Sequence, residues 1–372
     1  MLPARPLRAA VTTALAGLAL VACGDDNPTA RLQPGDVGAP ASGGGDLTGT
    51  LTGSGSSAQE SAQTAWIAGY QGRQPGVTVH YDSIGSGGGR ENIIAGATDF
   101  AGSDAYLDQQ ERQEVRDSCG PKGAMNLPVY ISPIAVPYNL PGVESLQLTP
   151  DVLAGIFNRE ISRWDDPAIA EDNPDEQLPD LPITAVNRSD ESGTTENFLE
   201  YLTAAAPHAW PHEPGAAWPV EGGEAAAQTT GVIEVVSSTP GAIGYADASA
   251  IGTLQTAAIG VGEEFVTYSP EAAARVVDAS EPVDTGVKGD LALDLARDTT
   301  ESGAYPIVLV SYLIVCHHYE KPQTATLVQD YVGYIASEEG QATAAEAAGS
   351  APISDRLRQR VLNSLELVTG GR

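Results

Sequence analysis

One polar stretch near the middle of the chain combines the groups that proteins use to bind small anions. In "AVNRSDESGTTENFLEYL", Arg188 stands shortly ahead of Ser192, Gly193 and Thr194, where a helix is predicted to begin. The N-terminus of a helix offers unpaired N–H groups and a partial positive charge, which together attract anions. The planar guanidinium of Arg188 matches a tetrahedral oxyanion through two parallel hydrogen bonds. The stretch therefore predicts a site for an oxyanion.

Two further segments have the same design. The loops 53–58 ("GSGSSA") and 85–89 ("GSGGG") each follow a predicted strand and precede a predicted helix. Glycine lets the backbone approach a ligand closely, and serine adds a hydroxyl donor. Each loop alone is explained by helix capping, which is the ordinary role of Ser and Thr at this position. Three such loops in one chain, with an Arg beside one of them, exceed what capping requires and favour an anion site.

Two carboxylates accompany the loops, namely Asp104 in "AGSDAY" and Asp190. A carboxylate repels an anion unless the anion carries a proton that it can donate. Monohydrogen phosphate carries such a proton and sulfate does not, and a site built around a ligand's donor rejects the analogue that lacks it by about 10⁴-fold. The carboxylates therefore predict a preference for phosphate. The alternative roles are a helix N-cap for Asp104 and an orienting partner of Arg188 for Asp190.

The composition limits the classes of ligand. The chain has 49 acidic and 19 basic residues among 372, a formal net charge of -30, and a hydrophobic content of 42% that is sufficient for folded cores. Nonspecific nucleic-acid binding is excluded, because it needs cations that neutralise the phosphate backbone. The overall negative field also repels small anions, so an anion site must act through local groups.

The N-terminal residues predict export and a lipid anchor. Residues 1–22 carry Arg5 and Arg8 ahead of an apolar stretch that is short for a membrane span, as in a lipoprotein signal peptide. The stretch ends in "LVAC", which resembles a lipobox and makes Cys23 the lipidated first residue of the mature chain. Residues 23–46, rich in Gly, Pro, Ala and Asp, are expected to form a flexible tether. The alternative is an ordinary secretory signal in which Cys23 occurs by chance.

After the tether, strand-like and helix-like patterns alternate, which predicts an α/β fold with an open, mostly parallel sheet. Two apolar, strand-like segments, 127–140 and 305–316, enclose a long second α/β region. This order predicts two lobes crossed twice by the chain. Lobe I is expected to comprise 47–131 together with 310–372, and lobe II 132–309. A ligand is expected in the cleft between the lobes.

Two cysteines remain within the predicted body, Cys119 and Cys316. Cysteines of exported proteins usually pair, so we predict a disulfide that closes a long loop. The alternative is two buried free thiols.

Seven stretches carry a resemblance to a known family. They are "LTGSGSS", "YDSIGSGGGRENIIAGATDFAGSDAYL", "NLPVYISPIAVPYNL", "IFNREISRWDDPAI", "AVNRSDESGTTENFLEYL", "PGAIGYAD" and "YPIVLVSYLIV". In this order and spacing they resemble the PstS family, the phosphate-binding lipoproteins of bacterial phosphate-specific ABC transporters, from about Leu47 to the C-terminus. The resemblance implies the two-lobed type II periplasmic-binding-protein fold. It further implies a monomeric extracytoplasmic receptor, anchored through Cys23, that delivers inorganic phosphate to permease subunits without catalysis, metal or cofactor.

The resemblance also implies a set of phosphate ligands. Its members by position are Ser57, Ala58 (through its N–H), Ser86, Asp104, Arg188, Ser192, Gly193 and Thr194. Asp104 matches the acceptor of the phosphate proton, and Asp190 matches the acid that pairs with the Arg. The chain departs from the family pattern where Ser57 replaces a Thr, Ala58 replaces a bulky apolar residue, and Glu191 replaces a small residue. We expect Glu191 to point to solvent.

Two other functions remain as alternatives. A secreted phosphate-ester hydrolase also holds phosphate with Arg and helix ends, but it needs a nucleophile or metals. The sequence contains neither a G-x-S-x-G nor an H-E-x-x-H motif, and the pair His208 and His212 is interrupted by prolines. A receptor for another oxyanion, such as sulfate or molybdate, is the second alternative, and Asp104 argues against it.

Overall fold

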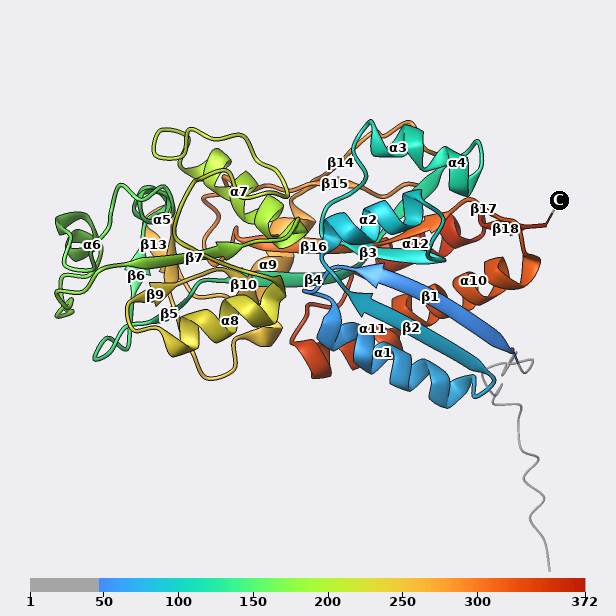
Figure 1. The fold of residues 1–372 in the computed structure, drawn as a ribbon, viewed down its shortest axis with the longest axis horizontal. Helices are drawn as coiled ribbons and strands as arrows, with labels where there is room; N and C mark the ends of the chain where they lie inside the picture. The colour runs from blue at the N-terminus through green and yellow to red at the C-terminus, as the bar shows by residue number, and fades with distance from the viewer. Residues whose placement is uncertain (1–46, 372) are drawn as a thin grey trace, which may run out of the picture. The chain divides into compact units, whose positions relative to one another are not determined.

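The computed structural model of the protein describes residues 47–371, which belong to one compact unit. The predicted signal peptide, Cys23 and the tether lie outside the described residues. Within residues 47–371 no helix is both long and apolar enough to cross a bilayer. The body is built around two main sheets, one of six strands and one of five. Each of these sheets forms one lobe together with its helices (Figure 1).

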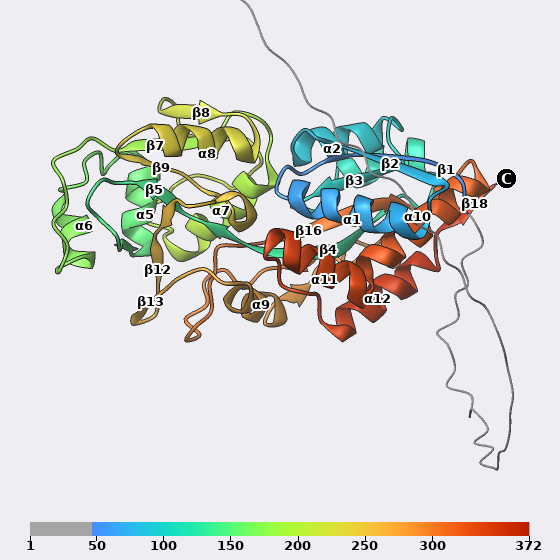
Figure 2. The ribbon, with the colours of Figure 1, turned by 90° about the horizontal axis from the view of Figure 1, so that it is seen from below.

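Lobe I contains a six-stranded sheet in the order β10-β4-β16-β3-β1-β2. Its strands are β1 (Gly49–Gly55), β2 (Val77–Ser83), β3 (Phe100–Ser103), β4 (Ala124–Ala135), β10 (Ala246–Asp247) and β16 (Val308–Cys316). Its helices are α1 (Glu60–Arg73), α2 (Ser86–Ile94), α3 (Glu111–Glu114), α4 (Arg116–Cys119), α10 (Pro322–Ala336), α11 (Glu338–Ala348) and α12 (Asp355–Leu365). Helices α1 and α2 lie on opposite faces of the sheet (Figure 2), as right-handed crossovers require when β1 lies between β2 and β3.

Lobe II contains a five-stranded sheet in the order β11-β5-β9-β7-β8 and a small sheet in the order β13-β12-β6. The strands of the first are β5 (Pro137–Asn139), β7 (Thr184–Arg188), β8 (Glu224–Ala226), β9 (Ala242–Ile243) and β11 (Gln255–Thr256), and those of the second are β6 (Gln147–Leu148), β12 (Ala258–Val261) and β13 (Glu264–Val266). Its helices are α5 (Pro150–Phe157), α6 (Pro167–Asp172), α7 (Gly193–Ala205) and α8 (Gln228–Ser238). The remaining elements are η1 (Ala248–Ala250), α9 (Pro270–Asp278), β14 (Glu281–Pro282), β15 (Leu293–Asp294), β17 (His318–Tyr319) and β18 (Thr369–Gly370).

The predicted parallel sheet is found for β1, β2 and β3, whereas β16 runs antiparallel to both β3 and β4. The prediction is wrong for β16, because this strand brings the chain back from the excursion into lobe II. A chain that leaves lobe I along β4 and returns along β16 needs no crossover helix, so the two strands pair antiparallel. The sheet of lobe I is therefore mixed.

The two long buried strands connect the lobes. β4 and β16 are buried along their whole length and supply the centre of the core. The predicted strand 127–140 is in fact two strands, because β4 ends at Ala135 and β5 begins at Pro137 in the other sheet. The segment that precedes β16 packs against lobe I, since Asp290 accepts a hydrogen bond of 2.6 Å from the Asn126 N–H. The loops at the ends of the strands are held by one continuous core that has residues from both lobes.

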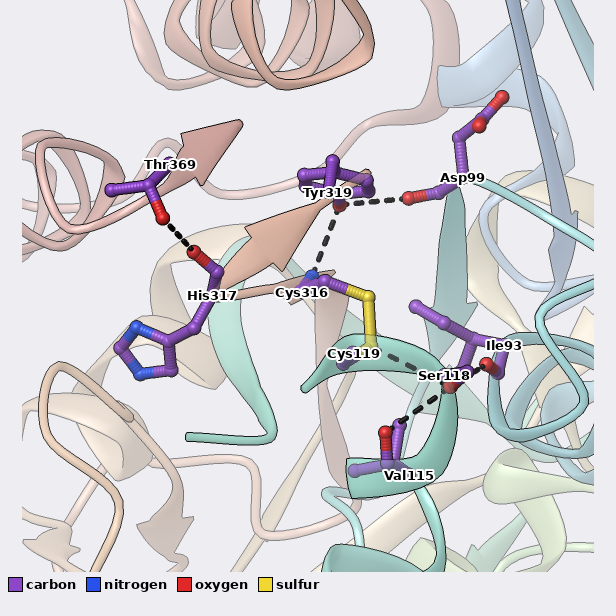
Figure 3. Close-up of a disulfide and its surroundings, with 9 residues drawn as sticks. All are labelled: Ile93, Asp99, Val115, Ser118, Cys119, Cys316, His317, Tyr319 and Thr369. Atoms are coloured by element: carbon purple, nitrogen blue, oxygen red, sulfur yellow. Dashed lines mark hydrogen bonds between the residues drawn. A yellow bond between two sulfur atoms is a disulfide. The ribbon is translucent and has the colours of Figure 1, made fainter. Parts of the chain in front are cut away.

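A disulfide joins Cys119 to Cys316, as predicted (Figure 3). It ties the end of α4 to the end of β16, with the two Cα atoms 4.8 Å apart and a sequence separation of 197 between the cysteines. The nearby Tyr319 hydroxyl accepts the Cys316 N–H and donates to the carbonyl of Asp99 (Figure 3). The disulfide therefore fixes the end of β16 to helix α4 inside lobe I.

Removing this disulfide is expected to lower stability without changing the fold. Cross-linking across so long a loop typically stabilises a domain by about 2–4 kcal/mol, mainly by restricting the unfolded chain. We predict that the double variant C119A/C316A loses this much free energy of unfolding in urea titrations followed by circular dichroism. Wild-type protein treated with a thiol reductant should match the variant. An unchanged urea midpoint in both would contradict a stabilising role for the disulfide.

Candidate functional site

Asp104 is the centre of the candidate site. It directly follows β3 and its side chain is 3% exposed. Its Oδ1 accepts hydrogen bonds of 2.5 Å from the hydroxyls of Ser56 and Ser311. Its Oδ2 accepts a bond of 3.1 Å from the Thr194 hydroxyl, which comes from the other lobe. A carboxylate oxygen has two lone pairs, so Oδ2 retains the capacity to accept one more proton donor.

A chain of buried side chains fixes the donors of Asp104. Gln59 donates to the Ser311 hydroxyl at 2.6 Å and to the Tyr312 carbonyl at 3.0 Å. Gln63 donates in turn to the Gln59 carbonyl oxygen at 2.8 Å. Because Gln59 already supplies the proton that Ser311 accepts, the hydroxyl proton of Ser311 is directed at Asp104. This network holds the carboxylate as a hydrogen-bond acceptor.

Arg188 is the last residue of β7 and its side chain is 2% exposed. Its Nε and Nη2 donate to the two oxygens of Asp190 at 2.8 and 2.5 Å. A guanidinium has five N–H groups, so this pairing occupies one edge of the fork and leaves the end of the fork free. The free end has no hydrogen-bond partner within residues 47–371 and can bind an oxyanion. The two charges fix each other's orientation.

The carboxylate of Asp190 is held ionised by its surroundings. Burial alone raises its pKa, but the hydrogen bonds and the positive charge of Arg188, together with the N–H of Gln228, outweigh burial and lower the pKa below its ordinary value. The Gln228 N–H donates to Oδ1 at 2.9 Å. Asp190 thus remains negative at neutral pH and reduces the net charge that Arg188 presents to a ligand.

The N-terminus of α7 meets Asp104 and Ser86 at close range. Ser192 caps the helix by accepting the Thr195 N–H at 3.2 Å, which leaves the hydroxyl proton of Ser192 available. The N–H groups of Gly193 and Thr194 make no hydrogen bond with residues 47–371. A Cβ atom at Gly193 would lie 2.6 Å from the Ser86 hydroxyl and 2.8 Å from the Asp104 Cβ, so only glycine fits there.

The second glycine-rich loop is the first turn of α2. The sequence predicted a helix from Arg90, but α2 begins at Ser86, so the glycines belong to the helix. Gly85 precedes it with φ 92°, a conformation that favours glycine, and a Cβ there would lie 2.7 Å from Asp190 Oδ2. Ser86 accepts the Asp104 N–H at 3.1 Å, which leaves its own proton free to donate.

The first loop is arranged differently from the expectation. The Ser57 hydroxyl bonds to the Thr229 hydroxyl at 3.0 Å, across to lobe II. The Ala58 N–H donates to the Ser56 hydroxyl at 3.1 Å and is not free in this state. Glu191 is exposed, in agreement with the expectation, and its carbonyl accepts the Gly87 N–H at 3.2 Å between the lobes.

The predicted site residues come together in one enclosed place. Asp104, Ser86, Gly193 and Thr194 are in direct contact, and Gly85 joins them to the pair Arg188 and Asp190. The exposed fractions are 5% for Ser57, 3% for Asp104 and Arg188, and 1% for Ala58, Ser86, Ser192 and Thr194. Any ligand bound by these groups is shut off from solvent.

Sequence reasoning missed several residues that complete the site. Ser56 and Ser311 hold Asp104, and Asn197 donates to the carbonyls of Asp104 and Gly193 at 2.7 and 2.8 Å. The buried Arg297 donates in turn to the Asn197 side-chain oxygen. Ser311 did leave a signal, because it is a hydroxyl residue inside the otherwise apolar strand "YPIVLVSYLIVC". Within residues 47–371 no cluster of three or more His, Cys, Asp or Glu is arranged to hold a metal ion.

An acidic cavity borders Asp104. It has a volume of about 190 Å³ and is lined by residues that include Asp108, Glu196, Glu200 and Arg297. Burial raises the pKa of Glu196 from 4.5 to about 7; Arg90 opposes this rise, and Glu200, Glu111 and Asp108 add to it. The lining carboxylates repel anions, so this cavity is unsuited to an oxyanion. Glu196 lies on α7, directly behind the helix start.

A family model and several known proteins match most of this chain. A family model described as the PBP superfamily domain matches residues 40–339. The phosphate-binding protein PstS 3 of Mycobacterium tuberculosis (strain H37Rv) is 36% identical over 369 residues, which is 97% of this chain and 98% of that protein. The phosphate-binding protein PstS of Methanocaldococcus jannaschii is 33% identical over 326 residues, 82% of each chain.

Solved structures share the fold at lower sequence identity. A high-affinity periplasmic phosphate-binding protein, PfluDING, bound with phosphate, superposes with a TM-score of 0.66 at 20% identity. The superposition covers 84% of this chain and 92% of that one. At this identity the likeness concerns the two-lobed fold.

The raised pKa of Glu196 predicts a pH-dependent stability. An acid whose pKa is higher in the folded state stabilises the fold below its ordinary pKa, and this stability is lost as pH rises through the folded value. The ionised form of Glu196 should therefore lower the free energy of unfolding above about pH 7. We predict that E196Q gains about 1–2 kcal/mol in free energy of unfolding at pH 8, because one pKa unit corresponds to about 1.4 kcal/mol and partial solvent contact reduces the effect.

Urea unfolding of wild type and E196Q at pH 4.5 and pH 8 checks this expectation. The two proteins should be nearly equally stable at the lower pH, where Glu196 is protonated in both states. E346Q, which changes an exposed acid on α11, serves as the control and should show a smaller difference. An E196Q variant that is no more stable than wild type at pH 8 would exclude a buried, charged Glu196.

Proposed function

This chain belongs to the PBP superfamily and, within it, to the PstS phosphate-binding proteins, and on that premise we propose that it binds one inorganic phosphate between its lobes. The observation that carries the proposal is the buried Asp104, whose Oδ2 keeps acceptor capacity among free N–H and hydroxyl donors. The phosphate ligands that we propose are Ser57, Ala58, Ser86, Asp104, Arg188, Ser192, Gly193 and Thr194.

Asp104 supports phosphate as the ligand because it is held as an acceptor. Ser56 and Ser311 donate to Oδ1, so that oxygen is fully used, and Thr194 leaves room on Oδ2 for one proton. The P–OH group of monohydrogen phosphate supplies that proton. Sulfate brings a bare oxygen to the same place, and two buried acceptors without a proton between them repel each other.

Arg188 supplies the positive charge for the remaining phosphate oxygens. Its free end can donate two hydrogen bonds to the anion while Asp190 holds the other edge. Ser86 and Ser192 have free hydroxyl protons, and Gly193 and Thr194 have free N–H groups. Neutral donors therefore outnumber the charged one, and the site functions despite the negative charge of the whole chain. In the first loop, Ser57 can donate its hydroxyl proton to the ligand while it accepts from the Thr229 hydroxyl and N–H. The Ala58 N–H must exchange the Ser56 hydroxyl for the ligand.

Enclosure favours a receptor over a phosphate-ester hydrolase. The groups that surround the ligand are at most 5% exposed, so an ester's organic arm has no path to solvent between them. We therefore propose that the protein has no enzymatic role. It binds phosphate, closes, and presents the closed form to the permease subunits of an ABC importer. This enclosure also strengthens each charge-assisted hydrogen bond, because water is removed.

The remaining proposals concern location and organisation. We propose that the protein works as a monomer on the extracytoplasmic side of the membrane, anchored through a lipid on Cys23. For the lobes we propose the boundaries predicted from the sequence, 47–131 with 310–372 in lobe I and 132–309 in lobe II. Strand β10 and the ends of β4 and β16 cross these boundaries, because they pair within the sheet of lobe I. The anchor is tested by mass spectrometry of the membrane fraction, which should show a lipid-modified N-terminal Cys23.

Replacing Arg188 by Ala is predicted to weaken phosphate binding by about 10²- to 10⁴-fold, because charge-assisted hydrogen bonds contribute about 1.5–3 kcal/mol each and the variant loses two. R188K keeps the charge but not the planar fork, so its phosphate affinity should lie between those of wild type and R188A. Isothermal titration calorimetry with inorganic phosphate measures both. Arg163→Ala, at a side chain that is 47% exposed, is the control and should bind like wild type. Wild-type affinity in R188A would remove Arg188 from the site.

Replacing Asp104 by Asn is predicted to reduce the discrimination between phosphate and sulfate. An amide can turn its NH₂ group toward the ligand, so it accommodates sulfate where the carboxylate repels it. Discrimination against sulfate should fall from about 10⁴-fold in wild type by at least about tenfold in D104N. Competition titrations of the two anions at pH 8 measure this ratio. A D104N variant that still rejects sulfate as strongly as wild type would show that another group reads the proton.

A further inference from the structure

The start of α8 makes contacts with lobe I that the ligand residues do not explain. The side-chain amide of Gln228 donates to the Ser83 carbonyl, at the end of β2, at 2.7 Å. Gln228 also lines a cavity of about 430 Å³ whose other lining residues all belong to α1, β2 and Ile84. Gln228 is therefore an extension of lobe II that reaches into a recess of lobe I.

The backbone of Gln228 connects the same residue to the charged pair of the site. Its N–H donates at 2.9 Å to Asp190 Oδ1, and the same carboxylate accepts two hydrogen bonds from Arg188. Gln228 has φ 62°, and among the described residues Arg159 is the other non-glycine residue with positive φ. Residues other than glycine are strained in this region and persist there where the surrounding structure requires it. Here the conformation directs the N–H of Gln228 to Asp190 and its side chain to Ser83.

The next residue repeats the pattern. The hydroxyl of Thr229 bonds to the Ser57 hydroxyl at 3.0 Å, and the N–H of Thr229 donates to the same oxygen at 3.3 Å. Thr229 is 3% exposed and Ser57 is 5% exposed, so both bonds are shielded from water. Two consecutive residues of lobe II thus bind two segments of lobe I, the end of β2 and the loop after β1.

We propose that Gln228 and Thr229 form a latch that holds the lobes closed, and that Gln228 is a positioning residue for the pair Asp190 and Arg188. This inference rests on the proposed phosphate binding. The enclosed ligand can leave only when the lobes part, and parting breaks the bonds of both latch residues to lobe I. The latch therefore sets the lifetime of the complex. Association starts from separated lobes and does not depend on it.

The experiment compares four full-length variants with wild type. Q228A removes the bond to Ser83 and keeps the backbone. Q228G also permits φ 62° without strain. T229V removes the hydroxyl bond to Ser57 at nearly constant shape. R159G is the matched control, because it relaxes the same backbone conformation at a residue whose surroundings, Gly222 and Gly223, belong to lobe II.

Two quantities are measured for each variant: the rates of phosphate binding and release, and the rate of backbone hydrogen exchange. The first is the dissociation rate of radiolabelled inorganic phosphate in a chase with unlabelled phosphate, together with the association rate. Loss of a buried hydrogen bond is expected to raise the dissociation rate about tenfold in Q228A and T229V, less in Q228G, and to leave association within about twofold. The second is hydrogen exchange without phosphate, read in peptides that cover 85–89 and 189–192. These peptides should exchange faster in Q228A and T229V than in wild type.

The outcomes separate the latch from the phosphate site. Wild-type dissociation and exchange in both Q228A and T229V would overturn the latch, as would an equal change in R159G. If wild-type protein binds no phosphate, the proposed function fails and the exchange comparison alone decides whether Gln228 and Thr229 hold the lobes together.

Discussion

The burial of one carboxylate is the constraint on which the rest of the structure depends. A charged Asp104 removed from water costs several kcal/mol unless each of its oxygens finds donors. Those donors come from three places in the chain: the loop after β1, the middle of β16 and the start of α7. Satisfying Asp104 therefore fixes the relative positions of these segments. The geometry of an anion site follows from that arrangement.

The fold supplies this arrangement through its two crossing strands. β4 carries the chain out of lobe I and β16 carries it back, and Ser311 in the buried middle of β16 points to Asp104. Glycine then allows the two lobes to approach closely. Gly193 lies against Asp104 and Ser86, and Gly85 lies against Asp190, at distances that leave no space for a Cβ atom. A side chain at either position would hold the lobes apart and admit water to the charges.

The sequence predicted the site residues that are close together in the chain. It did not predict the contacts between residues that are far apart in the chain. Arg188, Asp190 and the start of α7 were visible together because they are neighbours in the chain. The disulfide and the order of strands and helices followed from export and from patterning. Ser311 and Thr229 were missed because their roles depend on partners 207 and 172 residues away. The antiparallel direction of β16 was missed because alternating patterns do not encode the direction in which a strand returns. Gln228 was missed because its backbone conformation has no compositional signal.

The most direct test of the account is a calorimetric titration of the phosphate-free, full-length protein with inorganic phosphate and then, separately, with sulfate at pH 8. The account predicts one tight site for phosphate and no measurable heat with sulfate, because Asp104 accepts a proton that sulfate lacks. Binding of both anions with similar affinity would contradict the central role of the buried carboxylate.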